Sequence, residues 1–381
     1  MPGTLFLLCG EPSGEAYAAR VARAFRERFP GVPMEGIGSS RLSGEGVKLL
    51  MDYGDISVMG LTEVLSHLPA IRNALKAAKE RVSRPDIGAL VLVDFPDFNF
   101  RVGRAAWKLG VPVIYYIPPQ VWAWRAGRAR TLARFTRGVV VLFPFEEEFL
   151  KGHGVNAVFA GHPLMEELAP FFEAPPDPER FGIPKGRTVV GILPGSRPAE
   201  VEAHLPTLLS AARRVAERVP EAHFAIPVAR PPLLERIGRH VAGCGFPVTL
   251  VGEDQRLLFR SMEAAMAVSG TATLELALLG VPSVIVYRTS WLTYRIAKRL
   301  AKVRSVGLPN IVAGDPFLPE LIQDDFRPSR VAEVLCGILL DPGRRERLRG
   351  RCLTLRENLR GPGPTKAVVD MLAREAAAAW A

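Results

Sequence analysis

Short apolar runs alternate with longer segments of helical periodicity along the chain. The apolar runs are rich in Val, Ile and Leu and nearly continuous, which is typical of parallel strands covered on both faces. Alternation of such runs with helices predicts an α/β fold with doubly wound sheets. The expected strands are Thr4–Cys9, Leu90–Asp94, Pro112–Tyr116 and Gly138–Leu142 in the first half, and Thr188–Leu193, His223–Val228, Pro247–Val251, Ala264–Ser269 and Ser283–Tyr287 in the second.

A proline-rich stretch separates these two similar halves. Residues 169–187 read APFFEAPPDPERFGIPKGR and lack periodicity, which indicates a linker. The length of 381 residues favours two domains. We therefore predict two Rossmann-like doubly wound domains, residues 1–168 and 188–360, followed by a final helical segment, residues 361–381. Strand carboxyl ends bind ligands in such sheets, so we expect the site in a cleft between the halves.

Two glycine-containing turns of the second half carry the strongest candidate chemistry. LPGSR at 193–197 and SGTATLELALLG at 269–280 each follow an expected strand and open a helix. Such turns bind phosphate, the Arg197 guanidinium suits a diphosphate, and the Glu275 carboxylate suits a ribose diol. The alternative is ordinary helix capping, in which Glu275 serves the helix dipole. The candidates on this side are Gly195, Ser196, Arg197, Gly270, Thr271, Ala272, Thr273 and Glu275.

An acidic turn follows an expected strand of the first half. In VDFPDFN, at 93–99, Asp94 ends the strand, and Asp97 and Asn99 follow within the turn. A carboxylate at the carboxyl end of a strand is well placed for a general base, and desolvation raises its pKa into a useful range. Asp97 and Asn99 have an alternative role, because Asx turns of this kind cap the following helix.

Four further motifs of the first half offer candidate residues. They are CGEPSGE at 9–15, PPQVWAWR at 118–125, FPFEEEF at 143–149 and GHPL at 161–164. Tryptophans beside an arginine can bind sugar rings and phosphates, but they can also pack a loop into the core. A histidine can bind or polarise a phosphate, but a histidine before proline is as often structural. The candidates drawn from these motifs are Ser13, Glu15, Trp122, Arg125 and His162.

Charge and hydropathy limit the partners. The chain has 49 Lys and Arg against 39 Asp and Glu, a net charge of +10 that favours anionic partners. No nucleic-acid recognition motif is present, so we expect no nucleic-acid partner. Residues 288–304, RTSWLTYRIAKRLAKVR, have the pattern of a basic interfacial helix, with a solvated surface helix as the alternative. An anionic membrane surface is therefore an expected partner, and an oligomer is compatible with the sequence.

The sequence has no pattern typical of a membrane-spanning or exported protein, and this predicts its compartment. No apolar run reaches the roughly 18 residues of a membrane span, and no export signal opens the chain. The four cysteines are far apart and form no metal-binding or disulfide pattern. We therefore expect a cytoplasmic protein that is peripheral on the inner face of the cytoplasmic membrane.

Taken in order, the motifs resemble those of the lipid-A-disaccharide synthases over about residues 5–325. The matching segments are GEPSGE, VMGLTEVL at 58–65, PDFN at 96–99, VWAWR at 121–125, FPFE, GHPL, LPGSR, GTATLE, LPN at 308–310 and ELIQ at 320–323. The resemblance implies an inverting GT-B glycosyltransferase. Such an enzyme joins UDP-2,3-diacylglucosamine to 2,3-diacylglucosamine 1-phosphate (lipid X), giving lipid A disaccharide 1-phosphate and UDP.

The resemblance also implies roles for individual residues. Asp94 matches the family's general base for the acceptor 6-hydroxyl, and Arg197 matches the arginine that neutralises the diphosphate. Ser196, Thr271, Thr273 and Glu275 match residues that hold UDP. These enzymes use no metal, in keeping with the lack of a DxD motif here, so we expect neither metal nor cofactor. The family's C-terminal helix usually packs back on the first domain.

Two departures from the family pattern fall in the acceptor-binding domain. This chain has Ser13-Gly14-Glu15 where the family usually has SGD, and Pro118-Pro119-Gln120 precedes VWAWR in place of SPS. Alternatives are a glycosyltransferase with another acceptor, a UDP-sugar epimerase or hydrolase, and a nonenzymatic membrane-associated binding protein. The acceptor-side candidates are Ser13, Glu15, Asp97, Asn99, Trp122, Arg125 and His162.

Overall fold

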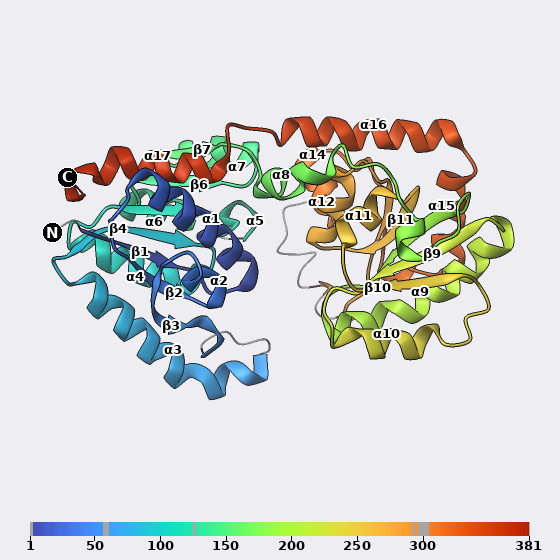
Figure 1. Cartoon of the computed structure of the whole chain (residues 1–381), viewed down its shortest axis with the longest axis horizontal. Helices are drawn as coiled ribbons and strands as arrows, with labels where there is room; N and C mark the ends of the chain where they lie inside the picture. The colour runs from blue at the N-terminus through green and yellow to red at the C-terminus, as the bar shows by residue number, and fades with distance from the viewer. Residues whose placement is uncertain (1–2, 56–60, 125–126, 292–293, 296–304, 381) are drawn as a thin grey trace. The chain divides into compact units, whose positions relative to one another are not determined.

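The computed structural model describes residues 3–55, 61–124, 127–291, 294–295 and 305–380 (Figure 1). Contacts divide the chain into two units, one of residues 1–163 and 360–381 and the other of residues 164–359. Each unit has one parallel sheet with helices packed on its faces. The predicted α/β fold with two doubly wound sheets is confirmed.

The first unit contains a seven-stranded sheet in the order β3-β2-β1-β4-β5-β6-β7. β1, β4, β5 and β6 are buried along their whole length, as their continuous apolar sequences predict. The strands are β1 (Thr4–Leu8), β2 (Met34–Gly38), β3 (Lys48–Asp52), β4 (Ile87–Val93), β5 (Val113–Tyr116), β6 (Gly138–Val141) and β7 (Ala157–Phe159).

Helices cover both faces of this sheet. One face packs against α1 (Pro12–Arg28) and α17 (Pro364–Ala376), and the other against α3 (Leu61–Val82), α4 (Pro96–Lys108) and α6 (Gly127–Phe135). Beyond α17, the Trp380 ring meets the Phe25 ring of α1 at a centroid distance of 4.8 Å. The end of the chain is thus part of the first unit's core. The shorter helices are α2 (Ser40–Ser43), α5 (Val121–Trp124) and α7 (Pro144–Lys151).

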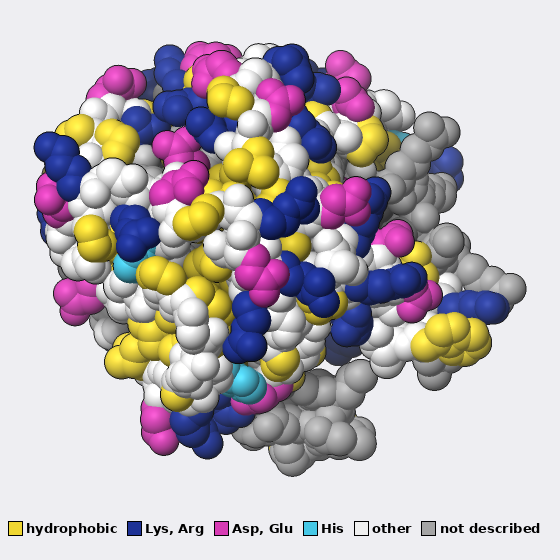
Figure 2. All heavy atoms as spheres, turned by 90° about the vertical axis from the view of Figure 1, so that its right-hand side faces the viewer, with side chains coloured by type: hydrophobic (Ala, Val, Ile, Leu, Met, Phe, Trp, Pro, Cys, Tyr) yellow, Lys and Arg dark blue, Asp and Glu magenta, His cyan; other side chains and the backbone are white. Residues whose placement is uncertain are grey.

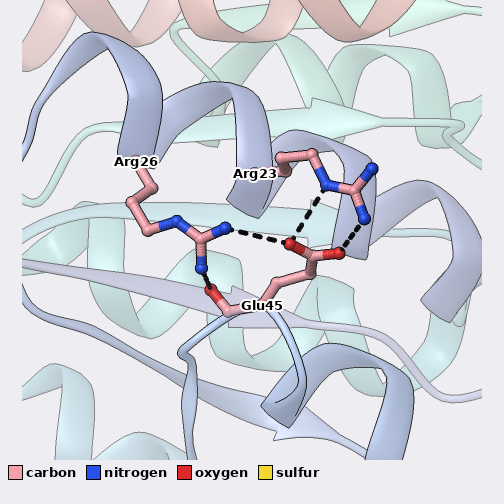
Figure 3. A network of polar contacts seen from close by, with 3 residues as sticks. All are labelled: Arg23, Arg26 and Glu45. Carbon is pink, nitrogen blue, oxygen red and sulfur yellow. Dashed lines mark hydrogen bonds and ion pairs between the residues drawn. The ribbon is translucent and has the colours of Figure 1, made fainter.

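A charged network ties α1 to the turn after α2 (Figure 3). The Arg23 Nε donates to Glu45 Oε2 at 3.2 Å, and the Arg26 guanidinium donates to the Glu45 backbone oxygen at 2.7 Å. The hydrogen bond from Arg23 lowers the pKa of Glu45. Because both arginines are largely exposed, solvent screens the pairs, and they contribute little to stability.

The second unit contains a six-stranded parallel sheet in the order β10-β9-β8-β11-β12-β13. α9, α10 and α15 pack into one hydrophobic core with it, while α12, α14 and α16 pack together on the other side. The strands are β8 (Thr188–Leu193), β9 (Ala222–Pro227), β10 (Val248–Val251), β11 (Ala264–Val268), β12 (Ser283–Tyr287) and β13 (Glu320–Ile322). The helices are α8 (Pro163–Leu168), α9 (Pro198–Arg218), α10 (Leu233–Val241), α11 (Gln255–Arg260), α12 (Thr271–Leu278), α14 (Leu308–Ala313), α15 (Pro328–Leu339) and α16 (Pro342–Asn358).

Residues 169–187, the expected linker, lie within this second unit. They contain two short 3-10 turns, Ala169–Phe171 and Glu179–Phe181. The Asp177 backbone N–H donates to Ser261 Oγ at 3.0 Å, which fastens the segment to the residue that follows α11. Arg260 Nε of α11 also donates to the Ala174 backbone oxygen at 3.1 Å, so two hydrogen bonds hold the stretch against its own unit.

Each sheet has a switch point at which the strand order reverses direction. In the first sheet it lies between the neighbours β1 and β4, and in the second between β8 and β11. Loops leaving the carboxyl ends of such a strand pair diverge and open a ligand-binding crevice. CGEPSGE and VDFPDFN leave β1 and β4, while LPGSR and SGTATLE leave β8 and β11. All four motifs therefore lie at switch points of their own sheets.

Candidate active site

The turn after β4 holds its backbone in an unusual conformation. Asp94 and Phe95 both have a φ of 48°, in the left-handed region that non-glycine residues rarely adopt. Two side chains donate to the Asp94 backbone oxygen, the Asn99 amide at 2.7 Å and the Tyr115 hydroxyl at 2.9 Å. The Asp94 backbone N–H donates to the Tyr116 oxygen of β5 at 3.2 Å. Asp94 is thus fixed at the end of its strand.

The turn after β1 packs directly against it. A Cβ atom on Gly10 would lie 2.3 Å from Cγ of the Phe95 ring, so only glycine fits beside this ring. A Cβ on Gly14 would lie 3.6 Å from Cβ of Asp94, an ordinary contact. Ser13 is exposed in the first turn of α1. Ser13 and Asp94 therefore belong to one surface at the switch point.

The environment of Asp94 suits it to proton transfer at neutral pH. Burial of the carboxyl, with a smaller effect from the Glu11 carboxylate, raises the pKa of Asp94 to about 6. A base is most effective when its pKa lies near the working pH, because it is then ionised and still basic. Asp94 meets this condition.

The other acidic candidates of the first unit have partners of their own. Glu15 is buried and accepts from the backbone of Ser39 at 2.6 Å and Leu42 at 3.0 Å. This carboxylate anchors the segment that begins α2. Asp97 is exposed and pairs with Arg128 of α6 at 2.6 Å, which joins α4 to α6.

The VWAWR, FPFE and GHPL motifs pack together. The Trp122 indole N–H donates to Glu146 Oε1 at 2.8 Å, and burial raises the pKa of Glu146 to about 7. The Phe143 ring stacks on His162 at a centroid distance of 5.4 Å. Burial lowers the pKa of His162 to about 3, so its ring is neutral at physiological pH. Arg125 lies outside the described residues.

In the second unit, the LPGSR turn is capped by a carboxylate from its own helix. Glu200 Oε2 accepts from the backbone N–H of Ser196 at 2.9 Å and of Arg197 at 3.3 Å. Gly195 has a φ of 110°, and a Cβ there would lie 2.6 Å from the Glu200 side chain. The Arg197 guanidinium stands 3.6 Å from Glu200 Oε1, with 66% of its side chain exposed. The backbone N–H groups that we expect to bind phosphate are therefore bound here by the Glu200 carboxylate.

The SGTATLE turn leads into α12 with its first residues open to solvent. Gly270 and Thr271 are exposed, whereas Ala272 is half-buried. Thr273 is buried and donates its hydroxyl to the Gly270 backbone oxygen at 2.7 Å. Thr273 thus fixes the turn that begins α12, and the amino end of this helix, the kind of position at which anions bind, is open to solvent.

Glu275, one turn into α12, is held by an arginine from α11. Arg256 Nε lies 3.4 Å from Glu275 Oε2, and the same guanidinium pairs with Glu167 of α8. Burial raises the pKa of Glu275, while the positive charge of Arg256 opposes that shift. Arg256 therefore favours an ionised Glu275 despite its burial.

Three residues that contact these turns or Glu275 were missed by the sequence reasoning. Tyr115 and Arg256 come from other elements, so no local pattern connects them with Asp94 or Glu275. Glu200 did have a signal, because it follows Arg197 by three residues, the spacing of a capping box.

The family follows from comparison with known proteins. A family model described as lipid-A-disaccharide synthetase matches residues 5–361. The chain belongs to the lipid-A-disaccharide synthase family. It is 37% identical to the lipid-A-disaccharide synthase of Trichlorobacter lovleyi, with 97% of each chain covered. It is 40% identical to the lipid-A-disaccharide synthase of Anaeromyxobacter dehalogenans, with 96% of each covered. The resemblance seen in the motifs is thus confirmed, and the chain is a glycosyltransferase of lipid A synthesis.

Solved structures show the same GT-B fold at low sequence identity. MurG of Acinetobacter baumannii has a TM-score of 0.60 at 14% identity, covering 98% of this chain and 100% of that one. A UDP-GlcNAc 2-epimerase of Neisseria meningitidis bound to UDP-GlcNAc has a TM-score of 0.63 at 12% identity, with the same coverage. The lipid-A-disaccharide synthase family thus shares its scaffold with other enzymes.

Two further family motifs support loops beside β12 and β13. Asn310 of LPN is buried and bonds both backbone groups of Leu318 through its side-chain amide. Gln323 of ELIQ accepts from the Thr289 backbone N–H at 2.7 Å and donates to its oxygen at 3.0 Å. A cavity of about 530 Å³ lies there, lined by Arg288, Thr289, Trp291, Tyr294, Arg295, Gln323 and Asp324. VMGLTEVL falls partly outside the described residues.

Proposed function

We propose that the chain transfers 2,3-diacylglucosamine from UDP to the 6-hydroxyl of 2,3-diacylglucosamine 1-phosphate, with inversion at the anomeric carbon. The products are lipid A disaccharide 1-phosphate and UDP. The observation that carries the proposal is the position of Asp94, which two buried side chains fix at the switch point of the first sheet, where burial raises the pKa of its carboxyl to about 6. The two substrates are assigned from the synthase family to which the chain belongs.

The chemistry divides between the two units. Asp94 accepts the proton of the acceptor 6-hydroxyl as its oxygen attacks the anomeric carbon of the donor. The bond from that carbon to the UDP oxygen breaks, and UDP leaves with the electron pair. The charge that develops on the diphosphate is stabilised by Arg197 and by the amino end of α12, as preorganised donors do in such steps.

The donor residues are those of the second unit. Arg197 is exposed and pairs with Glu200 at 3.6 Å, so a diphosphate replaces Glu200 as its partner. Gly195, Ser196, Gly270, Thr271 and Ala272 offer backbone or hydroxyl donors to UDP, while Thr273 fixes the turn. Glu275, which pairs with Arg256, accepts from the ribose hydroxyls.

The acceptor residues are those of the first unit. Ser13 and the half-exposed Trp122 reach the surface there, and we include Arg125 of the same VWAWR motif in the acceptor site. Glu15, Asn99 and His162 are buried, so we assign them supporting roles in the acceptor domain and no direct contact with the acceptor. Asp97 acts through its pair with Arg128.

Product analysis tests this reaction directly. The protein is incubated with UDP-2,3-diacylglucosamine, alone and with 2,3-diacylglucosamine 1-phosphate, and the products are analysed by mass spectrometry. We expect a disaccharide 1-phosphate only when both substrates are present. Consumption of the UDP-sugar without the acceptor would indicate an epimerase or hydrolase instead, and turnover of other acceptors alone would change the acceptor assignment.

We also propose that residues 288–304 meet an anionic membrane surface on the cytoplasmic side. Trp291 is 65% exposed, and the Arg295 guanidinium lies 4.5 Å from the centroid of its ring. An exposed tryptophan beside a cation is typical of a segment at a bilayer interface. Residues 292–293 and 296–304 lie outside the described part of the chain. In the described part, no helix is long and apolar enough to cross a membrane.

The distribution of charged side chains does not by itself identify the surface that would meet a membrane. On the face drawn in Figure 2, basic side chains are interspersed with acidic ones and form no single patch. The membrane proposal therefore rests on the sequence of residues 288–304 and on the exposure of Trp291.

Vesicle binding tests the membrane proposal. We expect the protein to bind vesicles containing anionic lipid and to dissociate as salt rises, since surface charges are screened. Trp291→Ala should reduce this binding severalfold, whereas Trp107→Ala, which removes a 50% exposed tryptophan from α4, should leave it unchanged. Binding that is absent, insensitive to salt or equally reduced by both substitutions would contradict the proposal.

A further inference from the structure

We infer that Asn99 and Tyr115 are positioning residues that hold Asp94 in the left-handed conformation from which its carboxylate acts. The inference rests on the proposed role of Asp94 as the base. Neither residue touches the reacting atoms in this role. Both act on the backbone that carries Asp94.

The two residues bind one backbone atom from two directions. Asn99 stands in the first turn of α4, and Tyr115 lies on β5, the strand next to β4. Their donors lie 2.7 Å and 2.9 Å from the Asp94 backbone oxygen, and both side chains are fully buried. Asn99 also donates to the Val93 oxygen at 3.3 Å. Water therefore has little access to replace these bonds.

The two hydrogen bonds act against an unfavourable backbone conformation. A left-handed conformation is costly for a residue other than glycine, and Asp94 and Phe95 are two in succession. Two buried hydrogen bonds to one backbone oxygen offset part of that cost. The loss of either bond should therefore let the turn relax. The Phe95 ring, seated over Gly10, would move with it.

A purely structural role makes a different prediction. If the two bonds only stabilise the fold, their loss lowers the melting temperature and leaves the chemical step of the folded enzyme intact. If they position Asp94, the chemical step slows and the carboxyl gains solvent. Since burial is the main cause of the raised pKa of Asp94, its titration in the activity profile should then move to lower pH.

The test uses Tyr115→Phe, which removes only the hydroxyl, and Asn99→Ala as a second variant. Tyr116→Phe is the matched control, since Tyr116 neighbours Tyr115 but packs in the core on the other face of the sheet. We expect kcat to fall between about tenfold and a hundredfold in the first two variants, as small misplacements of a catalytic group do. UDP affinity should not change, and the acid limb of kcat/KM should move to lower pH.

Two results would overturn the inference. One is wild-type kcat in folded Tyr115→Phe and Asn99→Ala protein; the other is a loss of kcat with the acid limb unmoved. Asp94→Asn, measured alongside, separates this failure from that of the proposed function. If Asp94→Asn is inactive while both positioning variants behave like Tyr116→Phe, only the positioning role is wrong. If Asp94→Asn is fully active, the base assignment itself is wrong.

Discussion

Replacing Asp94 by Asn should lower kcat by a factor of about 10² to 10⁴, the usual contribution of a positioned general base. The amide keeps the size of the carboxyl but cannot accept the proton of the acceptor hydroxyl. Affinity for UDP should stay at the wild-type value, because the donor residues belong to the second unit. Steady-state rates and UDP titration by calorimetry measure the two quantities separately.

The pH dependence of the wild-type enzyme gives a second readout of the same residue. The base acts only when ionised, so kcat/KM should be constant above the pKa of Asp94, about 6, and fall about tenfold per pH unit below it. An acid limb at about pH 4, where ordinary carboxyls titrate, would contradict the assignment.

Replacing Asp94 by Asn should raise the stability of the folded protein at pH 8, although it lowers kcat. The pKa of Asp94 is raised from 3.8 to about 6, so its ionised form destabilises the folded state above pH 6, and this cost disappears below pH 3.8. The difference corresponds to roughly 3 kcal/mol at most. Asp94→Asn should therefore be the more stable protein at pH 8 and lose that advantage as pH falls. Asp86→Asn, at the residue that precedes β4 and pairs with Arg81, is the control for activity alone and should retain kcat.

The central strands of both sheets could be predicted because burial on both faces leaves continuous apolar runs. The strands that were missed lie at or near sheet edges, where that signal fails. β2 reads MEGIG and β3 is half-exposed, while β7 and β13 have only three residues each. A three-residue strand at a sheet edge is recognised by its hydrogen bonds to the neighbouring strand. A single sequence contains no information on that pairing.

The candidate site was predictable at the level of turns but not of contacts. Asp94, Arg197 and Gly270 stand at strand ends, and that position follows from the local pattern. The buried bonds around them do not, because Tyr115 and Arg256 come from elements far along the chain. The bond from Glu200 to the backbone N–H groups of LPGSR was also not predicted, although Glu200 follows Arg197 at the spacing of a capping box.

Replacing Arg197 by Ala should weaken UDP binding about thirtyfold and remove most of the activity. A charge-assisted hydrogen bond contributes about 2 kcal/mol, which corresponds to that change in affinity. The loss in kcat/KM should be larger than the loss in affinity, because the guanidinium also stabilises charge that develops as UDP leaves.

The structure offers a closely matched control for this substitution. Arg330 is also a largely exposed arginine, in the first turn of α15, and it pairs with a glutamate three residues on, as Arg197 does with Glu200. Arg330→Ala removes the same kind of surface charge and ion pair but lies on no glycine turn at a switch point. Titration with UDP should therefore distinguish the two variants. Equal UDP affinity in both would show that Arg197 serves only as the partner of Glu200, and the diphosphate would then have to be held by the amino end of α12.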